Sequence, residues 1–120
     1  MFPQNRYDPF AGVPQVDAVD AHKQAQDGGV AILDVREPEE WELGHIEAAR
    51  WIPLDQLPTR WRELDPKTKW ICVCLAGTRS NYAAALLRGQ GLDVSNLAGG
   101  MLEWQSHQLP ITPPGIVGMH

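Results

Sequence analysis

The chain has 120 residues, with 15 acidic and 10 basic side chains and a net charge of −5. This length fits one domain that buries its own core, and the acidic balance argues against general nucleic-acid binding. No stretch approaches the roughly 20 apolar residues of a membrane-spanning helix, and residues 1–15 lack the features of a targeting segment. With only two cysteines, one residue apart, we expect a cytoplasmic protein with free thiols and no nucleic-acid or membrane partner.

Short apolar runs alternate with helical segments along the chain, the pattern of an α/β domain with parallel strands. We expect one domain at 14–109, between an N-terminal arm (1–13) and a C-terminal arm (110–120) that are rich in proline and lack hydrophobic periodicity. The expected elements, in order, are a helix at 18–26 capped by Asp17, a strand at 30–33, a short helix that begins at Pro38 and that Gly44 ends, a strand at 50–53, a helix with Leu57, Trp61 and Leu64, a strand at 70–73, a helix at 80–88, a strand at 94–97 and a last helix with Trp104.

The junction between the strand at 70–73 and the following helix carries the motif Cys74-Leu75-Ala76-Gly77-Thr78-Arg79. A helix start leaves backbone N–H groups without partners and carries a partial positive charge, so it stabilises an anion such as a thiolate. Gly77 permits a turn in which successive N–H groups converge, and Arg79 adds a fixed positive charge. The pattern therefore predicts that Cys74 is a reactive cysteine, largely thiolate at neutral pH.

The second cysteine, Cys72, lies inside the expected strand, which is typical of a small buried hydrophobic residue. A Cys-x-Cys pair without a nearby histidine pair also lacks the spacing of a structural zinc site. We therefore expect no metal ligand at Cys72 or Cys74.

Two charged residues, Asp34 and Arg36, follow the strand at 30–33 and should lie with Cys74 at the carboxyl edge of a parallel sheet. One hypothesis is that they support the loop: Asp34 would accept hydrogen bonds from loop backbone, and Arg36 would pair with an acidic residue such as Glu40 or add to the positive field. The alternative is a structural salt bridge. Either role would support the loop rather than perform chemistry.

Two further motifs lie near expected strand ends. His45, in Gly44-His45-Ile46, is the histidine that one would nominate as a general base for Cys74, but the motif favours a structural turn. In Ala98-Gly99-Gly100, the glycine pair would let the backbone pass close to another element, such as the loop at Cys74.

These motifs together resemble the rhodanese-like sulfurtransferases. The active loop of that family runs Cys-x-x-Gly-x-Arg-Ser after a central strand, and residues 74–80 match it completely. The other matches, in the family's order, are Asp34-Val35-Arg36, Gly44-His45-Ile46, and Ala98-Gly99-Gly100 followed by Trp104. The resemblance covers about Val16 to His107.

The resemblance implies a three-layer α/β fold, with a central, mostly parallel five-stranded sheet and helices on both faces. It implies a sulfurtransferase that moves a sulfane sulfur through a persulfide on Cys74, without metal or organic cofactor. The donor would be thiosulfate, another small sulfur compound or a persulfide-carrying protein, and the acceptor a thiol, cyanide or a protein. Substrate-binding residues would be those that follow Cys74 in the loop, Leu75, Ala76, Gly77, Thr78, Arg79 and Ser80, with Asp34 and Arg36 in support.

Two other functions remain open. A cysteine-dependent phosphatase or arsenate reductase would also hold an anion between a thiolate and an arginine, but the loops of those phosphatases are longer than the four residues between Cys74 and Arg79. A binding module that had lost its chemistry would not need the intact cysteine, glycine and arginine. Because Arg79 is the loop's only cation and thiosulfate is a dianion, we further expect a persulfide to be a better donor than thiosulfate.

Overall fold

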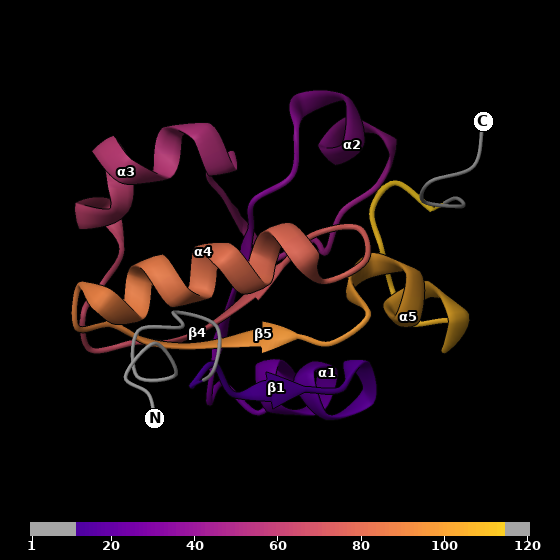
Figure 1. Cartoon of the computed structure of the whole chain (residues 1–120). Helices are drawn as coiled ribbons and strands as arrows, with labels where there is room; N and C mark the ends of the chain where they lie inside the picture. Colours follow the sequence, from indigo (N-terminus) through magenta and orange to yellow (C-terminus); the bar gives the residue numbers. More distant parts are fainter. Residues whose placement is uncertain (1–11, 115–120) are drawn as a thin grey trace, which may run out of the picture.

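The computed structural model describes residues 12–114, and its centre is a five-stranded sheet in which every neighbouring pair of strands is parallel (Figure 1). Residues 1–11 and 115–120, which include most of the expected N-terminal arm and the end of the expected C-terminal arm, lie outside the described residues. The strands stand in the order β1-β5-β4-β2-β3. Their bounds are β1 (Gln15–Val16), β2 (Ala31–Asp34), β3 (Arg50–Trp51), β4 (Lys69–Val73) and β5 (Asp93–Leu97).

Helices cover both faces of this sheet, so the expected three-layer α/β fold is confirmed. One hydrophobic cluster joins one sheet face to α3, α4 and the short 3₁₀ helices, and a second cluster joins the other face to α1 and α5. None of these helices is both long and apolar enough to cross a membrane. Their bounds are α1 (Ala18–Gln26), α2 (Pro38–Leu43), η2 (Leu54–Gln56), α3 (Leu57–Arg60), η3 (Trp61–Glu63), α4 (Thr78–Gly89) and α5 (Gly100–Ser106).

Local sequence signals explain several of these elements. The carboxylate of Asp17 accepts a hydrogen bond from Asp20 N at 2.8 Å and caps α1, whose bounds agree with the predicted 18–26. The helix α2 has Pro38 in its first turn and ends at Gly44, as predicted. Four of the five residues of β4 are buried, which fits its central place in the sheet.

Other elements differ from the predictions. The strand β1 was not predicted, because two residues carry no period and their strand conformation comes from pairing with β5. The helix expected around Trp61 is divided between one short α-helix and two 3₁₀ turns. The helix α4 begins at Thr78, two residues before its expected start, so Arg79 lies in its first turn.

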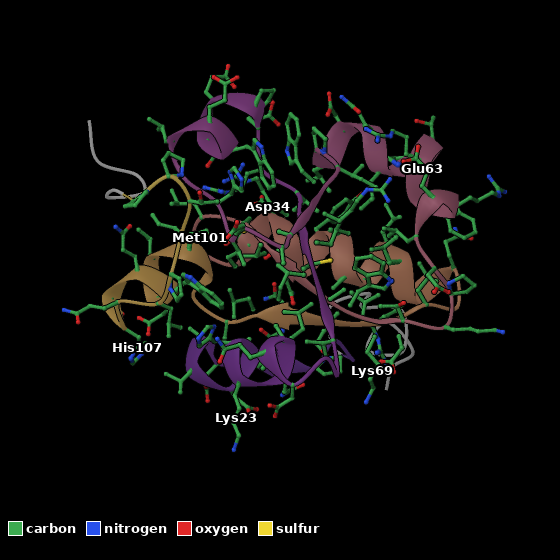
Figure 2. All side chains as sticks on the ribbon, turned by 180° about the vertical axis from the view of Figure 1, so that it is seen from behind. Lys23, Asp34, Glu63, Lys69, Met101 and His107 are labelled. Atoms are coloured by element: carbon green, nitrogen blue, oxygen red, sulfur yellow. The ribbon has the colours of Figure 1, made fainter. Side chains whose placement is uncertain are left out.

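Most charged side chains lie at the surface, and the hydrophobic clusters fill the interior (Figure 2). Met101 of α5 is fully buried in one of the two hydrophobic clusters. Asp34 and Arg36 are ionisable side chains that are also fully buried. The other labelled side chains are exposed and lie at the periphery: Lys23, Glu63, Lys69 and His107.

The turn between β5 and α5 lies directly against the end of β4. Met101 N donates to the Cys74 carbonyl at 2.8 Å, and Leu102 N donates to the Leu75 carbonyl at 3.0 Å. A Cβ atom at Gly100 would lie 2.4 Å from the Cys74 carbonyl oxygen, so only glycine fits there. The expected close approach of the glycine pair to the active loop is therefore confirmed.

We predict that Gly100→Ala will disturb this contact. Gly91→Ala is the matched control, since both glycines have positive φ (+59° and +92°) but no atom lies within 4 Å of a Cβ at Gly91. Gly100→Ala should lower the free energy of unfolding by about 1–3 kcal/mol more than Gly91→Ala, measured by urea denaturation. Equal losses in the two variants would show that the close contact adds nothing beyond backbone strain.

Candidate active site

The centre of the site is the Cys74 sulfur, which lies at the end of β4 beneath the loop that leads into α4. Cys74 is 1% exposed, and three neutral donor groups lie within hydrogen-bond distance of its Sγ. The backbone N–H of Gly77 donates at 3.1 Å and that of Ser80 at 3.3 Å, and the Ser80 hydroxyl lies at 3.2 Å. Hydrogen bonds to a charged form favour that form, so this arrangement suits a sulfur anion.

Gly77 makes this geometry possible. Its φ of +101° lies in the left-handed region, which agrees with the predicted turn. A Cβ atom there would lie 3.1 Å from Gly99 N, and the Gly77 carbonyl accepts a hydrogen bond from Asn96 Nδ2 at 3.1 Å. The turn is therefore held from the side of β5 while its N–H points to the sulfur.

A chain of polar side chains extends from the sulfur to the edge of the sheet. The Ser80 hydroxyl also lies 2.6 Å from Asn96 Oδ1, so its single proton is donated either to this oxygen or to the sulfur. Asn96 Nδ2 donates to Gln15 Oε1 at 2.9 Å. Gln15 Nε2 in turn donates to Asn81 Oδ1 at 2.8 Å. Sequence reasoning missed Gln15, Asn81 and Asn96. The signal available in the sequence was an amide, Asn96, inside the expected strand at 94–97 and just before the Ala98-Gly99-Gly100 motif.

Arg79 forms an ion pair with Glu40 of α2 and does not bond to the sulfur. Its Nη1 and Nη2 lie 2.7 Å and 2.8 Å from the two carboxylate oxygens of Glu40. The hydrogen bond from Arg79 lowers the pKa of the Glu40 carboxyl, so this side chain is charged at neutral pH. Arg79 was expected to add a fixed positive charge beside Cys74, and the structure shows that this charge is paired with Glu40.

Asp34 and Arg36 form a fully buried salt bridge with each other. Arg36 Nη2 donates to Asp34 Oδ2 at 2.8 Å and also to the Gly44 carbonyl at 2.7 Å, which ties the end of β2 to the turn after α2. Arg36 therefore pairs with an acidic residue, as one hypothesis held, but this residue is Asp34, two residues away and buried beside it, and not the suggested Glu40. The structural salt bridge is the alternative that the contacts support.

His45 belongs to a structural turn, as the motif favoured. Its ring stacks on the Trp41 ring with centroids 3.5 Å apart, and its Nδ1 lies 2.8 Å from the Trp41 carbonyl. Its backbone pairs with Thr112. These contacts hold His45 in the turn, and none of them involves the Cys74 sulfur.

A cleft of about 780 Å³ opens beside the loop. The loop residues Ala76, Gly77, Thr78 and Arg79 line one part of it, while Leu75 packs into the hydrophobic cluster on the side of α1 and α5. The amides of Gln15, Asn81 and Asn96 line another part. Within residues 12–114, no group of three or more His, Cys, Asp or Glu side chains is arranged to hold a metal ion.

The fold and this loop define a class of protein, and comparison with known proteins identifies it. Residues 17–107 match the family model of the rhodanese-like domain, and the chain belongs to this family. A sulfurtransferase from Allochromatium vinosum is 37% identical over 86 residues, which is 71% of this chain and 80% of that protein. Two relatives from Bacillus subtilis, 36% and 43% identical, are longer, and this chain covers 52% and 59% of their lengths.

Solved structures share the fold of this chain. A rhodanese-related protein from Thermoplasma volcanium has a TM-score of 0.80 and 29% identity, and the match covers 84% of this chain and 99% of that one. A protein of unknown function from Rhodopseudomonas palustris, described as a possible tyrosine phosphatase, has a TM-score of 0.76 and 25% identity. That match covers 88% of this chain and 89% of the other.

We predict that Asp34→Asn strongly destabilises the protein. The change leaves the Arg36 guanidinium buried without a counter-charge, which should lower the free energy of unfolding by about 3–5 kcal/mol. Glu47→Gln, which removes an exposed acidic charge, should stay within about 0.5 kcal/mol of wild type. Urea denaturation measures both variants, and an Asp34→Asn protein as stable as the control would contradict the structural role of the pair.

The two cysteines should differ in reactivity toward iodoacetamide. Burial raises the pKa of the Cys72 thiol, and the nearby Cys74 and Asp34 add to the shift. Because a raised pKa keeps a thiol protonated, Cys72 should stay unlabelled in the native protein up to about pH 9. Cys74 should be labelled, because N–H groups favour its thiolate, but more slowly than in the unfolded protein, because it is 1% exposed. Peptide mass spectrometry checks this, with guanidinium-unfolded protein as the control in which both label. Equal native labelling would contradict the assignment.

Proposed function

We propose that the protein is a sulfurtransferase in which Cys74 takes a sulfane sulfur from a donor and carries it as a persulfide. The observation that carries this proposal is the set of three neutral donor groups at Cys74 Sγ, the N–H groups of Gly77 and Ser80 and the Ser80 hydroxyl. A sulfur atom surrounded by N–H and O–H groups at the start of a helix is suited to carry negative charge. The names of relatives in this family support the same general activity.

The reaction has two displacement steps. In the first, the Cys74 thiolate attacks the outer sulfur of the donor; a new S–S bond forms at Sγ, the donor's own bond to that sulfur breaks, and the leaving group departs with the electron pair. The leaving group is sulfite from thiosulfate or a thiolate from a persulfide. In the second, an acceptor thiol or cyanide attacks the outer sulfur, and the electron pair of the broken S–S bond returns to Cys74.

The burial of Cys74 limits what can reach it. With 1% of the residue exposed, a donor has to present a sulfur atom at the end of an unhindered bond. A terminal sulfane sulfur meets this condition on a small molecule and on a persulfide-carrying protein alike. A reducing compartment such as the cytoplasm would suit the cycle, because Cys74 must return to the free thiolate.

The phosphatase alternative has less support. A phosphate would need the arginine of the loop, and both terminal nitrogens of Arg79 are bonded to Glu40. Four residues between Cys74 and Arg79 also make a short loop for a phosphate-sized anion. The binding-module alternative is the one that the following experiment separates from catalysis.

We predict that incubation with thiosulfate or cysteine persulfide adds the mass of one sulfur atom to Cys74. Cys74→Ser should abolish both this addition and the transfer of sulfur to a thiol acceptor, because serine is not a comparable nucleophile. Cys72→Ala, which shortens a fully buried side chain on the same strand, is the matched control and should retain most of the transfer. Peptide mass spectrometry and sulfide release measure the two effects.

No sulfur on Cys74 with either donor would favour the binding module. Equal loss of transfer in the two variants would contradict the assignment of Cys74 as the nucleophile.

A further inference from the structure

Both terminal nitrogens of the Arg79 guanidinium donate to one carboxylate. Its Nη1 and Nη2 each donate to a different oxygen of Glu40, at 2.7 Å and 2.8 Å. This two-bond pairing between planar groups is the strongest geometry available to an arginine and a carboxylate. The pair joins residues 39 positions apart and is partly buried, so it is less weakened by solvent than a surface pair.

Glu40 is also held in place by a hydrogen bond within its own helix. Its Oε1 also accepts a hydrogen bond from Glu37 N at 3.0 Å, as part of the capping box at the start of α2. The carboxylate therefore has two separate restraints, one from α2 and one from α4. This arrangement keeps Arg79 turned toward Glu40.

Within residues 12–114, no other cation lines the cleft that could replace Arg79. Among the described residues that line the cleft, Arg79 is the only one with a charged side chain. Arg36 is fully buried and paired with Asp34. The exposed surface of α2 adds further negative charge through Glu39 and Glu42.

We propose that Glu40 determines the specificity of the site for its sulfur donor. By pairing with Arg79, Glu40 removes from donor binding the one cation that the described residues place in the cleft, so that the site takes sulfur from a thiol persulfide in preference to the thiosulfate dianion. This inference rests on the proposed sulfur transfer and adds the class of the donor. Glu40 acts through Arg79 and is a specificity-determining residue, not a catalytic one.

The physical reason is the difference in charge between the two donors. Attraction to a guanidinium scales with the charge of the ligand, so a free Arg79 would help a dianion about twice as much as a monoanion. Cysteine persulfide carries at most one net negative charge, and its transferable sulfur is bonded to another sulfur. Hydrogen bonds from neutral N–H groups favour both donors, but they give the dianion no compensating charge.

The test is the second-order rate constant for persulfide formation on Cys74, measured by rapid quenching and mass spectrometry without an acceptor. Thiosulfate and cysteine persulfide are compared at low and moderate salt in four proteins. Wild type is compared with Glu40→Gln, which keeps the shape and frees Arg79, and with the Glu40→Gln/Arg79→Gln double variant, which also removes the cation. Glu42→Gln is the control for net charge, since it removes an exposed acidic charge from the same helix.

We expect wild type to react faster with cysteine persulfide. Glu40→Gln should raise the rate constant for thiosulfate about tenfold relative to that for cysteine persulfide, and the gain should shrink with salt. The double variant should return to the wild-type ratio, and Glu42→Gln should stay within about twofold of it. If the ratio of the two rate constants returns to the wild-type value in the double variant, the change in Glu40→Gln comes from the freed charge of Arg79 and not from a loss of loop positioning.

Two results would overturn the inference while leaving the sulfur transfer intact. One is a wild-type preference for thiosulfate at both salt concentrations. The other is a Glu40→Gln protein whose rate constants for the two donors change together. If wild type forms no persulfide on Cys74 with either donor, the proposed function itself fails, and this inference fails with it.

Discussion

The shape of the sulfur site depends on the close approach of α5 to the end of β4. The backbone N–H groups of Met101 and Leu102 bond to the carbonyls of Cys74 and Leu75, and the absence of a side chain at Gly100 permits this contact. With these carbonyls bound on the side of α5, the N–H groups of Gly77 and Ser80 are directed at the sulfur. The geometry of the site is therefore a consequence of how β5 and α5 pack.

Charged and neutral groups have separate tasks around this loop. Two ion pairs connect separate elements of the fold. Asp34–Arg36 ties β2 to the turn at Gly44, and Glu40–Arg79 ties α2 to α4. The sulfur is bound by neutral donors alone among the described contacts. A neutral cradle can hold a sulfur anion without attracting every small anion in solution, because dipoles act over a shorter range than charges.

The sequence predicted the features that depend on a residue's own backbone or on its neighbours in the chain. It did not predict contacts whose partner lies far away in the sequence. The apolar runs predicted three of the central strands, Asp17 predicted its own helix cap, and Gly77 predicted the left-handed turn. The partner of Arg79 was out of reach, since several acidic residues were available and only the packing of α2 against α4 selects Glu40. Asn96 was missed for the same reason: its function depends on Gly77 and Ser80, which belong to another strand–helix junction.

The two edge strands of the sheet differ in length from its central strands. Both edge strands, β1 and β3, are two residues long, and the longer strands β2, β4 and β5 lie between them. A short edge presents few unpaired N–H and C=O groups, so it gives another chain little to align with. The parallel sheet can thus be built from strongly apolar strands, with the risk of edge-to-edge aggregation confined to its two shortest members.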